Sequence, residues 1–420
     1  MRDIRNVAVG VGIVLAATGT ARAQGAGPTF ARDIAPIFQE KCQTCHRPGQ
    51  MGPMPLTTYQ EVRPWVRAIK TKVVNREMPP WHIDRTVGVQ GFLNDISLTD
   101  TQIDTIARWV DGGAPAGDPK DLPPAKQWPN DLAWRLEEMF NRPPDLTVKS
   151  TPWTQPAEGQ DQWWQPVVDS GLTEDRWIRA VEVRPTLKGR RIVHHGNSAL
   201  AEFAVGKAGE IYPEGTGKLL KANEKVSFDI HYHSVGEEIT DQLEVGVWFY
   251  PKGFVPKYQI RSSAMGVFQA MDTFDLPPGR VTIHHAYIPL SEPAKLISYQ
   301  PHMHVRGKAM SMEAIYPDGR VEMLSHVANF QFNWHVNYVY ADHVAPVLPK
   351  GTIIHITAWH DNTAANKNNP DPTQWVGWGQ RSYDDMYHAH VRYINLSEED
   401  YQQIVSKRKR GVATTSAQQP

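Results

Sequence analysis

The two cysteines of the chain lie in the pentapeptide Cys42-Gln43-Thr44-Cys45-His46, and this motif constrains the fold more than any other feature. Its spacing is the attachment signature of a c-type haem. Two thioether bonds would hold the porphyrin, and His46 would be the proximal iron ligand. A redox Cys-x-x-Cys needs a thioredoxin-like context, and half of a zinc site needs two further ligands nearby. We therefore predict one covalent haem c.

The second axial ligand of an electron-transfer haem is often a thioether, which raises the reduction potential. Met78 is the preferred candidate, because Pro79 and Pro80 stiffen the loop that would present its sulfur. Met51, Met54 and His82 are the alternatives.

The N-terminal segment has the features of a secretory signal. Arg2 and Arg5 precede an apolar run over residues 7–17, and Ala21-Arg22-Ala23 has the small-x-small pattern of a cleavage site. The run is shorter than the roughly 20 residues that cross a bilayer. We expect a signal peptide over residues 1–23 and a periplasmic mature protein without an integral membrane segment.

The charge balance narrows the choice of partners. The formal net charge is -1 and no basic tract occurs. Nucleic-acid and anionic-membrane binding both require a basic footprint, so neither is expected. The remaining partners are small molecules and other redox proteins.

The apolar pattern divides the chain near Leu146. Helical periodicity over residues 30–41 and 59–76, and a helix capped by Ser97 or Thr99, predict an all-α cytochrome c domain over residues 24–117. Residues 118–148 are rich in proline and are typical of a linker, with a possible helix over residues 134–144.

Short alternating stretches follow, separated by Pro, Gly and Asp, and predict antiparallel strands, for example over residues 226–233, 280–289, 309–316 and 352–359. Some 250 residues of this kind suit two sandwiches in tandem, with a break within residues 258–273. The predicted fold class is thus multidomain: an all-α cytochrome c domain followed by two antiparallel, jelly-roll-like β-sandwiches over residues 149–268 and 269–400. Residues 401–420 form a tail.

Fifteen of the 17 histidines lie between His194 and His390. Residues two apart in a strand face the same side, so a His-x-His pair can clamp one metal ion, whereas an adjacent pair does so only where a bulge or strand end bends the chain. Because the haem motif uses both cysteines, thiolate copper centres are excluded. The groups are His194-His195, His231-Tyr232-His233, His284-His285, His302-Met303-His304 and Met386-Tyr387-His388-Ala389-His390.

The order of these motifs resembles the copper type II ascorbate-dependent monooxygenase family, which includes peptidylglycine hydroxylating monooxygenase and dopamine beta-monooxygenase. The resemblance covers roughly residues 150–395 and rests on Val193-His194-His195-Gly196, Asp229-Ile230-His231-Tyr232, Pro301-His302-Met303-His304 and Asp384-Asp385-Met386-Tyr387. It implies two coppers across a solvent-filled cleft, one held by His194, His195 and His231 and the other by His302, His304 and Met386. His233 is an alternative to His231.

The resemblance also implies a function. A three-imidazole copper would pass electrons, and a copper held by His302, His304 and Met386 would be the catalytic centre, because a thioether stabilises the Cu(I) that meets dioxygen. The expected reaction is hydroxylation of a C–H bond in a small organic substrate with O2. A periplasmic electron donor would supply the fused haem.

The chain also departs from that family. The disulfide cysteines of the animal enzymes are absent, and Gln300, His388 and His390 replace the Arg, Asn and Tyr that anchor substrate in the peptide-hydroxylating branch. A carboxylate-terminated peptide is therefore not the expected substrate. His388 and His390 either line the pocket, support ligands or lie on the surface, and His284-His285 has no counterpart. Two rivals stay open: a non-catalytic haem and copper electron-transfer or copper-handling protein, and a reductase of a small nitrogen or oxygen species.

Overall fold

The computed structural model describes residues 27–50, 52–128, 133–204, 209–269 and 271–416. The predicted signal peptide and Met51 lie outside these ranges. Within them, no helix is both long enough and apolar enough to cross a membrane.

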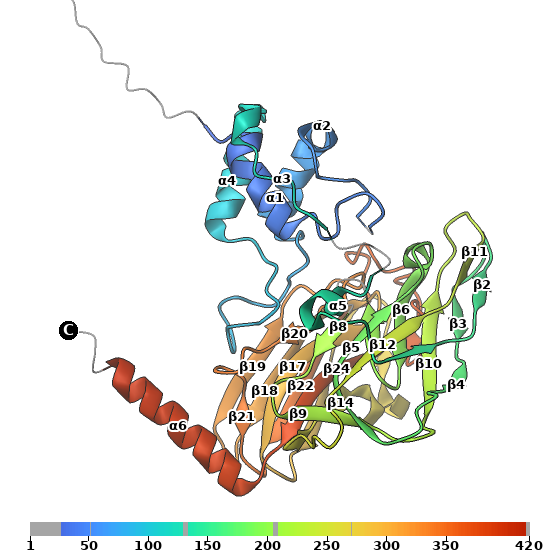
Figure 1. Ribbon diagram of the computed structural model, residues 1–420, viewed down its shortest axis with the longest axis vertical. Helices are drawn as coiled ribbons and strands as arrows, with labels where there is room; N and C mark the ends of the chain where they lie inside the picture. The colour runs from blue at the N-terminus through green and yellow to red at the C-terminus, as the bar shows by residue number, and fades with distance from the viewer. Residues whose placement is uncertain (1–26, 51, 129–132, 205–208, 270, 417–420) are drawn as a thin grey trace, which may run out of the picture.

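Short helices form the N-terminal part of the described chain, which lies above the sheets in Figure 1. The last of them begins where Thr99 and Gln102 cap each other in a capping box, so Thr99 rather than Ser97 is the N-cap. Phe38, Ile106 and Trp109 have no exposed surface and form the centre of its small core. The elements are η1 (Phe30–Ile34), α1 (Ala35–Lys41), α2 (Tyr59–Val62), η2 (Arg63–Trp65), α3 (Val66–Val74) and α4 (Asp100–Asp111).

The predicted fold class is wrong. The structure is mostly β sheet, with 35% strand and 19% helix, and its helices are few and short, so the N-terminal segment is not an all-α cytochrome c domain. The physical reason lies in residues 81–94. This segment leaves the helices and packs against the β sheets of the C-terminal part of the chain. Trp81 and Ile83 are buried in the core of that half, and isolated bridges join Ile83 to Val327 and Phe92 to Tyr340.

The predicted linker contains η3 (Pro119–Asp121) and α5 (Arg135–Phe140). The first turn of α5 is fixed on the sheet below it, because the Glu182 carboxylate accepts the backbone N–H groups of Arg135 and Leu136 at 3.0 and 2.9 Å. Trp134 and Trp248 pack edge to face beneath it.

The first β unit, as we call residues 146–259, contains a six-stranded sheet in the order β1-β12-β5-β9-β13 with β8 on β5. A five-stranded sheet in the order β3-β10-β6-β7 with β4 on β10, and a β11-β2 pair, complete it. The strands are β1 (Leu146–Lys149), β2 (Trp153–Gln155), β3 (Gln162–Trp164), β4 (Val167–Asp169), β5 (Arg176–Arg184), β6 (Val193–Ser198), β7 (Glu202–Ala204), β8 (Gly209–Ile211), β9 (Thr216–Leu220), β10 (Lys225–Tyr232), β11 (Ile239–Asp241), β12 (Glu244–Phe249) and β13 (Tyr258–Gln259), with η4 (Gly189–Arg191) before β6.

The second β unit, residues 261–395, contains a five-stranded sheet in the order β14-β24-β17-β20 with β21 on β17. It also has a four-stranded sheet, β16-β22-β18-β19, and a β15-β23 pair. Its strands are β14 (Arg261–Gly266), β15 (Asp275–Leu276), β16 (Val281–Pro289), β17 (Ala294–Met303), β18 (Gly307–Ile315), β19 (Val321–Val327), β20 (Tyr338–Val339), β21 (Val347–Leu348), β22 (Ile353–Asp361), β23 (Val376–Gly377) and β24 (Tyr387–Asn395), with η5 (Val267–Gln269) and η6 (Met271–Thr273) after β14.

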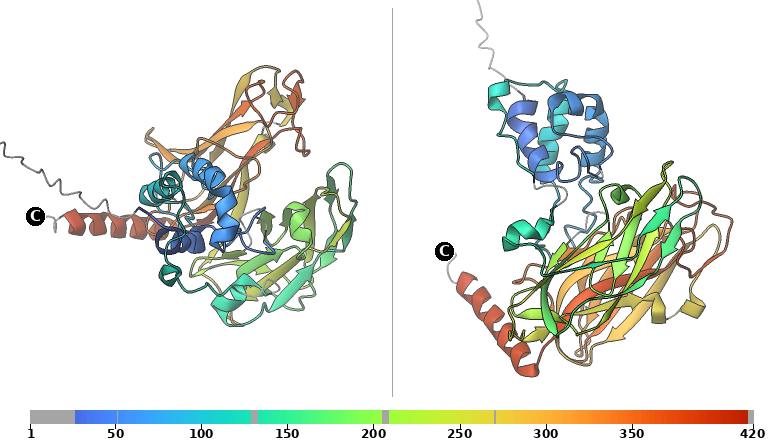
Figure 2. Two further views of the ribbon diagram at one scale, coloured as in Figure 1. Left: turned by 90° about the horizontal axis from the view of Figure 1, so that it is seen from above. Right: turned by 45° about the vertical axis from the view of Figure 1, so that its right-hand side comes forward.

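The two β units share buried contacts. Ile297, Ile394 and Leu396 of the second half pack into the hydrophobic core of the first unit. Seen from above, the green and orange sheets diverge as two arms, and the helices lie over the place where they meet (Figure 2). Most of the predicted tail is helical, as α6 (Glu398–Ser416).

Candidate metal and haem sites

A β-bulge brings the adjacent histidines of β6 into one group. In the β10·β6 pairing, His231 lies opposite His195 and Tyr232 opposite Val193, so His194 is the extra residue. A bulge bends the strand and re-aims a side chain, which is the condition that an adjacent pair needs to converge. We call His194, His195 and His231 the first histidine group.

The rings of the first group lie close together. Its three ring centroids are 5.6, 5.2 and 5.1 Å apart. Three imidazoles on one ion, with metal–nitrogen bonds of about 2.0 Å, would have centroids about 5.2–5.5 Å apart at tetrahedral to trigonal angles. The three rings are therefore close neighbours, but their ligand nitrogens do not all lie within 4.8 Å of one another, so the shared ion stays a prediction.

Two residues with no sequence signal hold His231 in place. The Asp161 carboxylate lies 2.8 Å from His231 Nε2, and Trp163 stacks on the imidazole with 4.2 Å between ring centroids. A carboxylate on one ring nitrogen fixes the tautomer and leaves the other nitrogen for a metal. Asp161 thus directs His231 Nδ1 toward the ligand role.

A second group forms across β17 and β24. His302 pairs with His388 and Gln300 with His390 in this ladder, so His302, His388 and His390 share one face. One ligand atom from each of these three residues lies within 4.8 Å of the other two. Among the described residues, no other three His, Cys, Asp or Glu side chains meet this criterion. We call them the second histidine group.

His335 lies between the two groups and was not singled out in the sequence, because it stands alone in a loop. Its ring centroid is 5.9 Å from that of His194 and 5.8 Å from that of His195. Its Nδ1 lies 3.0 Å from His302 Nδ1, and 2% of the residue is exposed. A lone histidine before Tyr338 carries no local pattern that would reveal this role.

The predicted ligands His304 and Met386 lie beside the second group. The His304 ring is 5.5 Å from that of His302, and its Nδ1 donates to the Asp384 carbonyl at 3.2 Å. Met386 precedes β24, is 7% exposed and packs within the hydrophobic core of the second β unit. Ligation by Met386 stays a prediction.

The buried imidazoles are held neutral. Burial, assisted by neighbouring imidazoles, lowers the pKa of His194 and of His335 to about 3. The same causes place the pKa of His302 and of His388 well below the ordinary value. Neutral imidazole is the form that binds a metal, so the protonation state suits that role.

Orphan nitrogens in the cluster fit a metal as well. His194 Nε2, His335 Nε2 and His388 Nδ1 are buried and have no hydrogen-bond partner in the described structure. A buried polar atom without a partner costs about 1–3 kcal/mol, and each such atom requires a physical explanation. A bound cation would account for lone pairs left in this way.

The two groups form one continuous cluster, which differs from the expectation of sites separated by a solvent-filled cleft. The ring centroids of His195 and His302 are 6.3 Å apart. Beside them, Gln300 donates to the Glu202 carboxylate of β7 at 2.6 Å and joins the two β units. The close approach places both groups within one buried region.

The other histidine pairs lie apart from this cluster. His233 is the more distant neighbour of His194, with 6.4 Å between ring centroids. The ring centroids of His284 and His360 are 5.4 Å apart. His285 is exposed, and its Nδ1 lies 3.0 Å from His355 Nε2. None of these rings belongs to either histidine group.

The donor set of the Cys-x-x-Cys-His motif fits a haem. His46 Nδ1 donates to the Met54 carbonyl at 3.0 Å, which leaves Nε2 for iron in the manner of a proximal histidine. Burial raises the pKa of the Cys42 thiol to about 12, which argues against a reactive redox thiolate. Gly52 packs so closely that a Cβ there would lie 2.6 Å from His46 Nδ1.

The alternatives for the second axial ligand lie in different environments. Met54 packs against the helical core, and Met78 is partly buried at the end of the turn after α3. The backbone N–H of His82 donates to the Tyr338 hydroxyl at 3.2 Å, which attaches this residue to the second β unit. The assignment of Met78 stays a prediction.

A polar contact joins the haem motif to the first histidine group. Arg190 in η4 donates to the Gln50 side chain at 3.4 Å. Gln50 follows His46 by four residues, and Arg190 precedes His194 by four. This contact joins the loop after the haem motif to the turn before β6.

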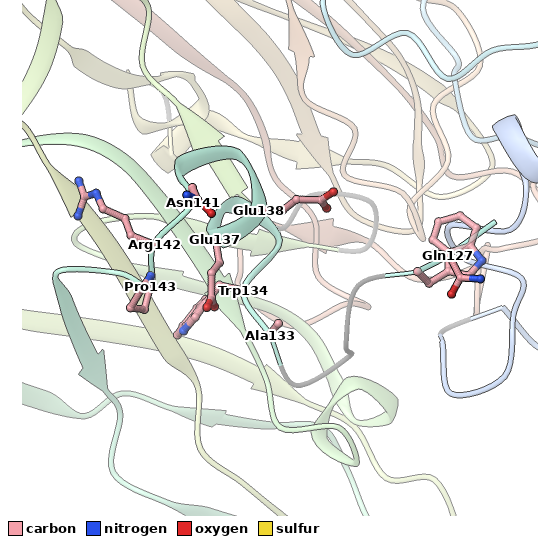
Figure 3. Close-up of a pocket in the computed structure, with 9 residues that line it drawn as sticks. Gln127, Ala133, Trp134, Glu137, Glu138, Asn141, Arg142 and Pro143 are labelled. Atoms are coloured by element: carbon pink, nitrogen blue, oxygen red, sulfur yellow. The ribbon is translucent and has the colours of Figure 1, made fainter.

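A separate surface pocket adjoins α5 (Figure 3). It is lined by polar and aromatic residues, including Trp134, Glu137 and Arg142, and contains no histidine. We assign it no part in metal chemistry.

Comparison with known proteins assigns no family. No family model matches the sequence, and no curated protein matches it. A putative alpha-L-fucosidase from Bacteroides ovatus ATCC 8483 is 8% identical, with a TM-score of 0.16 over 64% of this chain and 41% of the fucosidase. The infectious bursal disease virus Gx strain structure is 9% identical, with a TM-score of 0.19 over 66% of this chain and 80% of the other. The chain spans about two fifths of the fucosidase, and neither likeness defines a shared fold.

Proposed function

We propose that this protein is a copper-dependent monooxygenase that hydroxylates a C–H bond of a small organic substrate and receives electrons through its own c-type haem. The observation that carries the proposal is the convergence of His194, His195 and His231 with His302 in one buried cluster. The resemblance gives two coppers to this cluster and supplies the reaction. The haem motif beside the first group supplies a route for electrons.

Copper, when bound, would supply one-electron transfer at one site and dioxygen reduction at the other. The protein's own contribution is to keep the ligand imidazoles neutral by burial and to orient them through partners such as Asp161. Burial also excludes bulk water from the cluster, which protects reactive oxygen species from unproductive protonation. The resemblance places the catalytic role on His302, His304 and Met386.

The proposal is favoured over the non-catalytic rival by the burial of candidate ligands in the second β unit. A copper-handling site must release its ion, and release is easiest from exposed ligands. His302, His304 and His388 are 8%, 4% and 5% exposed. Ligands this deeply buried are suited to a resident ion rather than to cargo.

The experiment is turnover under oxygen-18 with a panel of small aromatic and aliphatic compounds and a chemical reductant. We expect label in a product of the copper-loaded protein, and a loss of at least about 100-fold in His302→Ala, since this residue belongs to both candidate ligand sets of the second β unit. His343→Ala, at an exposed histidine, is the matched control and should retain full turnover. Oxygen uptake without labelled product across the panel would favour the electron-transfer rival.

Haem removal tests the electron route separately. Cys42→Ser/Cys45→Ser should carry no covalent haem, as measured by the pyridine haemochrome spectrum. Turnover should then fall at least about tenfold with a protein electron donor but persist with ascorbate, which can reach copper directly. Equal turnover by both proteins with the protein donor would refute the proposed route.

A further inference from the structure

We propose that His302, His388 and His390 together bind one divalent metal ion, of the copper and zinc class, as a three-imidazole site in the second β unit. Two of these residues lie outside the ligand pattern of the resembled family. The inference deepens the proposed function, but metal binding here does not depend on oxygenation. The two ideas can therefore fail separately.

The geometry of the nitrogens carries the proposal. His388 Nε2 and His390 Nε2 are 3.0 Å apart, and His302 contributes a nitrogen within 4.8 Å of both. Two nitrogens bound to one ion at about 2.0–2.1 Å are about 2.8–3.4 Å apart at right to tetrahedral angles. The first pair already has the spacing of neighbouring ligands.

The strands hold these imidazoles in place. The rings of His302 and His388 stack, with centroids 4.6 Å apart and planes at 14°, and Phe268 covers the other face of His388 at 5.2 Å. Gly266 lies opposite His388 on β14, where a Cβ would lie 2.4 Å from the Tyr387 carbonyl. Both ring faces of His388 are therefore fixed before an ion arrives.

The remaining ring nitrogens of the site have different environments. His388 Nδ1 is buried and has no partner in the described structure, although Nε2 contacts His390. His335 lies 3.0 Å from His302 and orients it without joining the group. Three imidazole ligands suit copper or zinc rather than magnesium or calcium, which prefer oxygen.

Met386 differs from His388 and His390 in its position relative to β24. His388 and His390 lie within the strand, whereas Met386 precedes it and its side chain belongs to the hydrophobic core. Strand alternation therefore holds from His388 onward but does not extend to Met386. The antiparallel pairing of β17 with β24 places the imidazoles of His388 and His390 on the same face of the sheet as His302.

The test is a titration of metal-free protein with Cu(II) alone and with Zn(II) alone, followed by removal of weakly bound ion and measurement of metal content. The variants are His388→Asn and His390→Asn, with His343→Asn as the matched exposed control. We expect each of the first two to lose one equivalent, with affinity at that site weakened on the order of 100-fold. The control should bind as the wild type does.

Retention of the full metal content by either His388→Asn or His390→Asn would overturn the proposal. Circular dichroism of the metal-free variants checks folding, and His388→Gln and His390→Gln repeat the test if an Asn variant is unfolded. Electron paramagnetic resonance of Cu(II) in the His194→Gln/His195→Gln background gives an independent readout. Coupling to three nitrogens is expected there, and coupling to two would count against the site.

Discussion

Asp385→Ala is expected to destabilise the protein by about 3–5 kcal/mol, because it removes a buried charge that several groups share. Asp385 has no exposed surface, and its carboxylate accepts the backbone N–H groups of His304, Arg306 and Met386 at 3.0, 3.1 and 2.9 Å. Burial alone would raise the pKa of this carboxyl, yet His360 and the N–H of His304 hold it below its ordinary value. The ionised carboxylate therefore ties the end of β17 to the start of β24.

Urea unfolding of the metal-free protein measures the loss, and Asp384→Ala is the matched control. Asp384 pairs with Arg381 near the surface, so its removal should cost about 1 kcal/mol or less. Because Asp385 fixes the backbone of His304 and Met386, its variant should also bind metal more weakly at the second β unit. Equal stability of the two variants would show that the shared carboxylate is not a structural anchor.

Local elements could be predicted where one residue pattern decides the outcome. The capping box of Thr99 and Gln102 begins α4, and alternating apolar residues gave β10, β16, β18 and β22 to within one or two residues. The fold class failed because the destination of residues 81–94 depends on partners far along the chain. The ring centroids of Trp81 and Tyr338 are 4.8 Å apart, and no local sequence pattern links the two residues.

The candidate site shows the same division. The sequence identified the histidine pairs, and it identified the condition under which His194 and His195 could converge, namely a bulge. The bulge itself, the carboxylate of Asp161 and the position of His335 arise from strand register and loop packing. Met386 precedes β24, so strand alternation does not determine on which side of the sheet its side chain lies.

The metal-free protein is expected to lose several kcal/mol of stability as pH falls from 7.5 to 5.5. His302, His335 and His388 are 8%, 2% and 5% exposed, and burial lowers the pKa of each well below the unfolded value of 6.5. Below pH 6.5 the unfolded chain therefore binds more protons than the folded one, and stability rises with pH. Each histidine contributes a loss on the order of 1 kcal/mol at pH 5.5, so the three together contribute several kcal/mol.

Urea unfolding at the two pH values measures this loss. His335→Gln, which cannot titrate, should reduce the pH dependence by roughly 1 kcal/mol, whereas His343→Gln at an exposed position is the matched control. Bound metal should reduce it further, because ligation replaces the proton on each imidazole and stabilises the folded state. A flat profile for the metal-free protein would mean that these imidazoles contact water without metal, and the histidine cluster would then have to be assembled by the ion rather than by the fold.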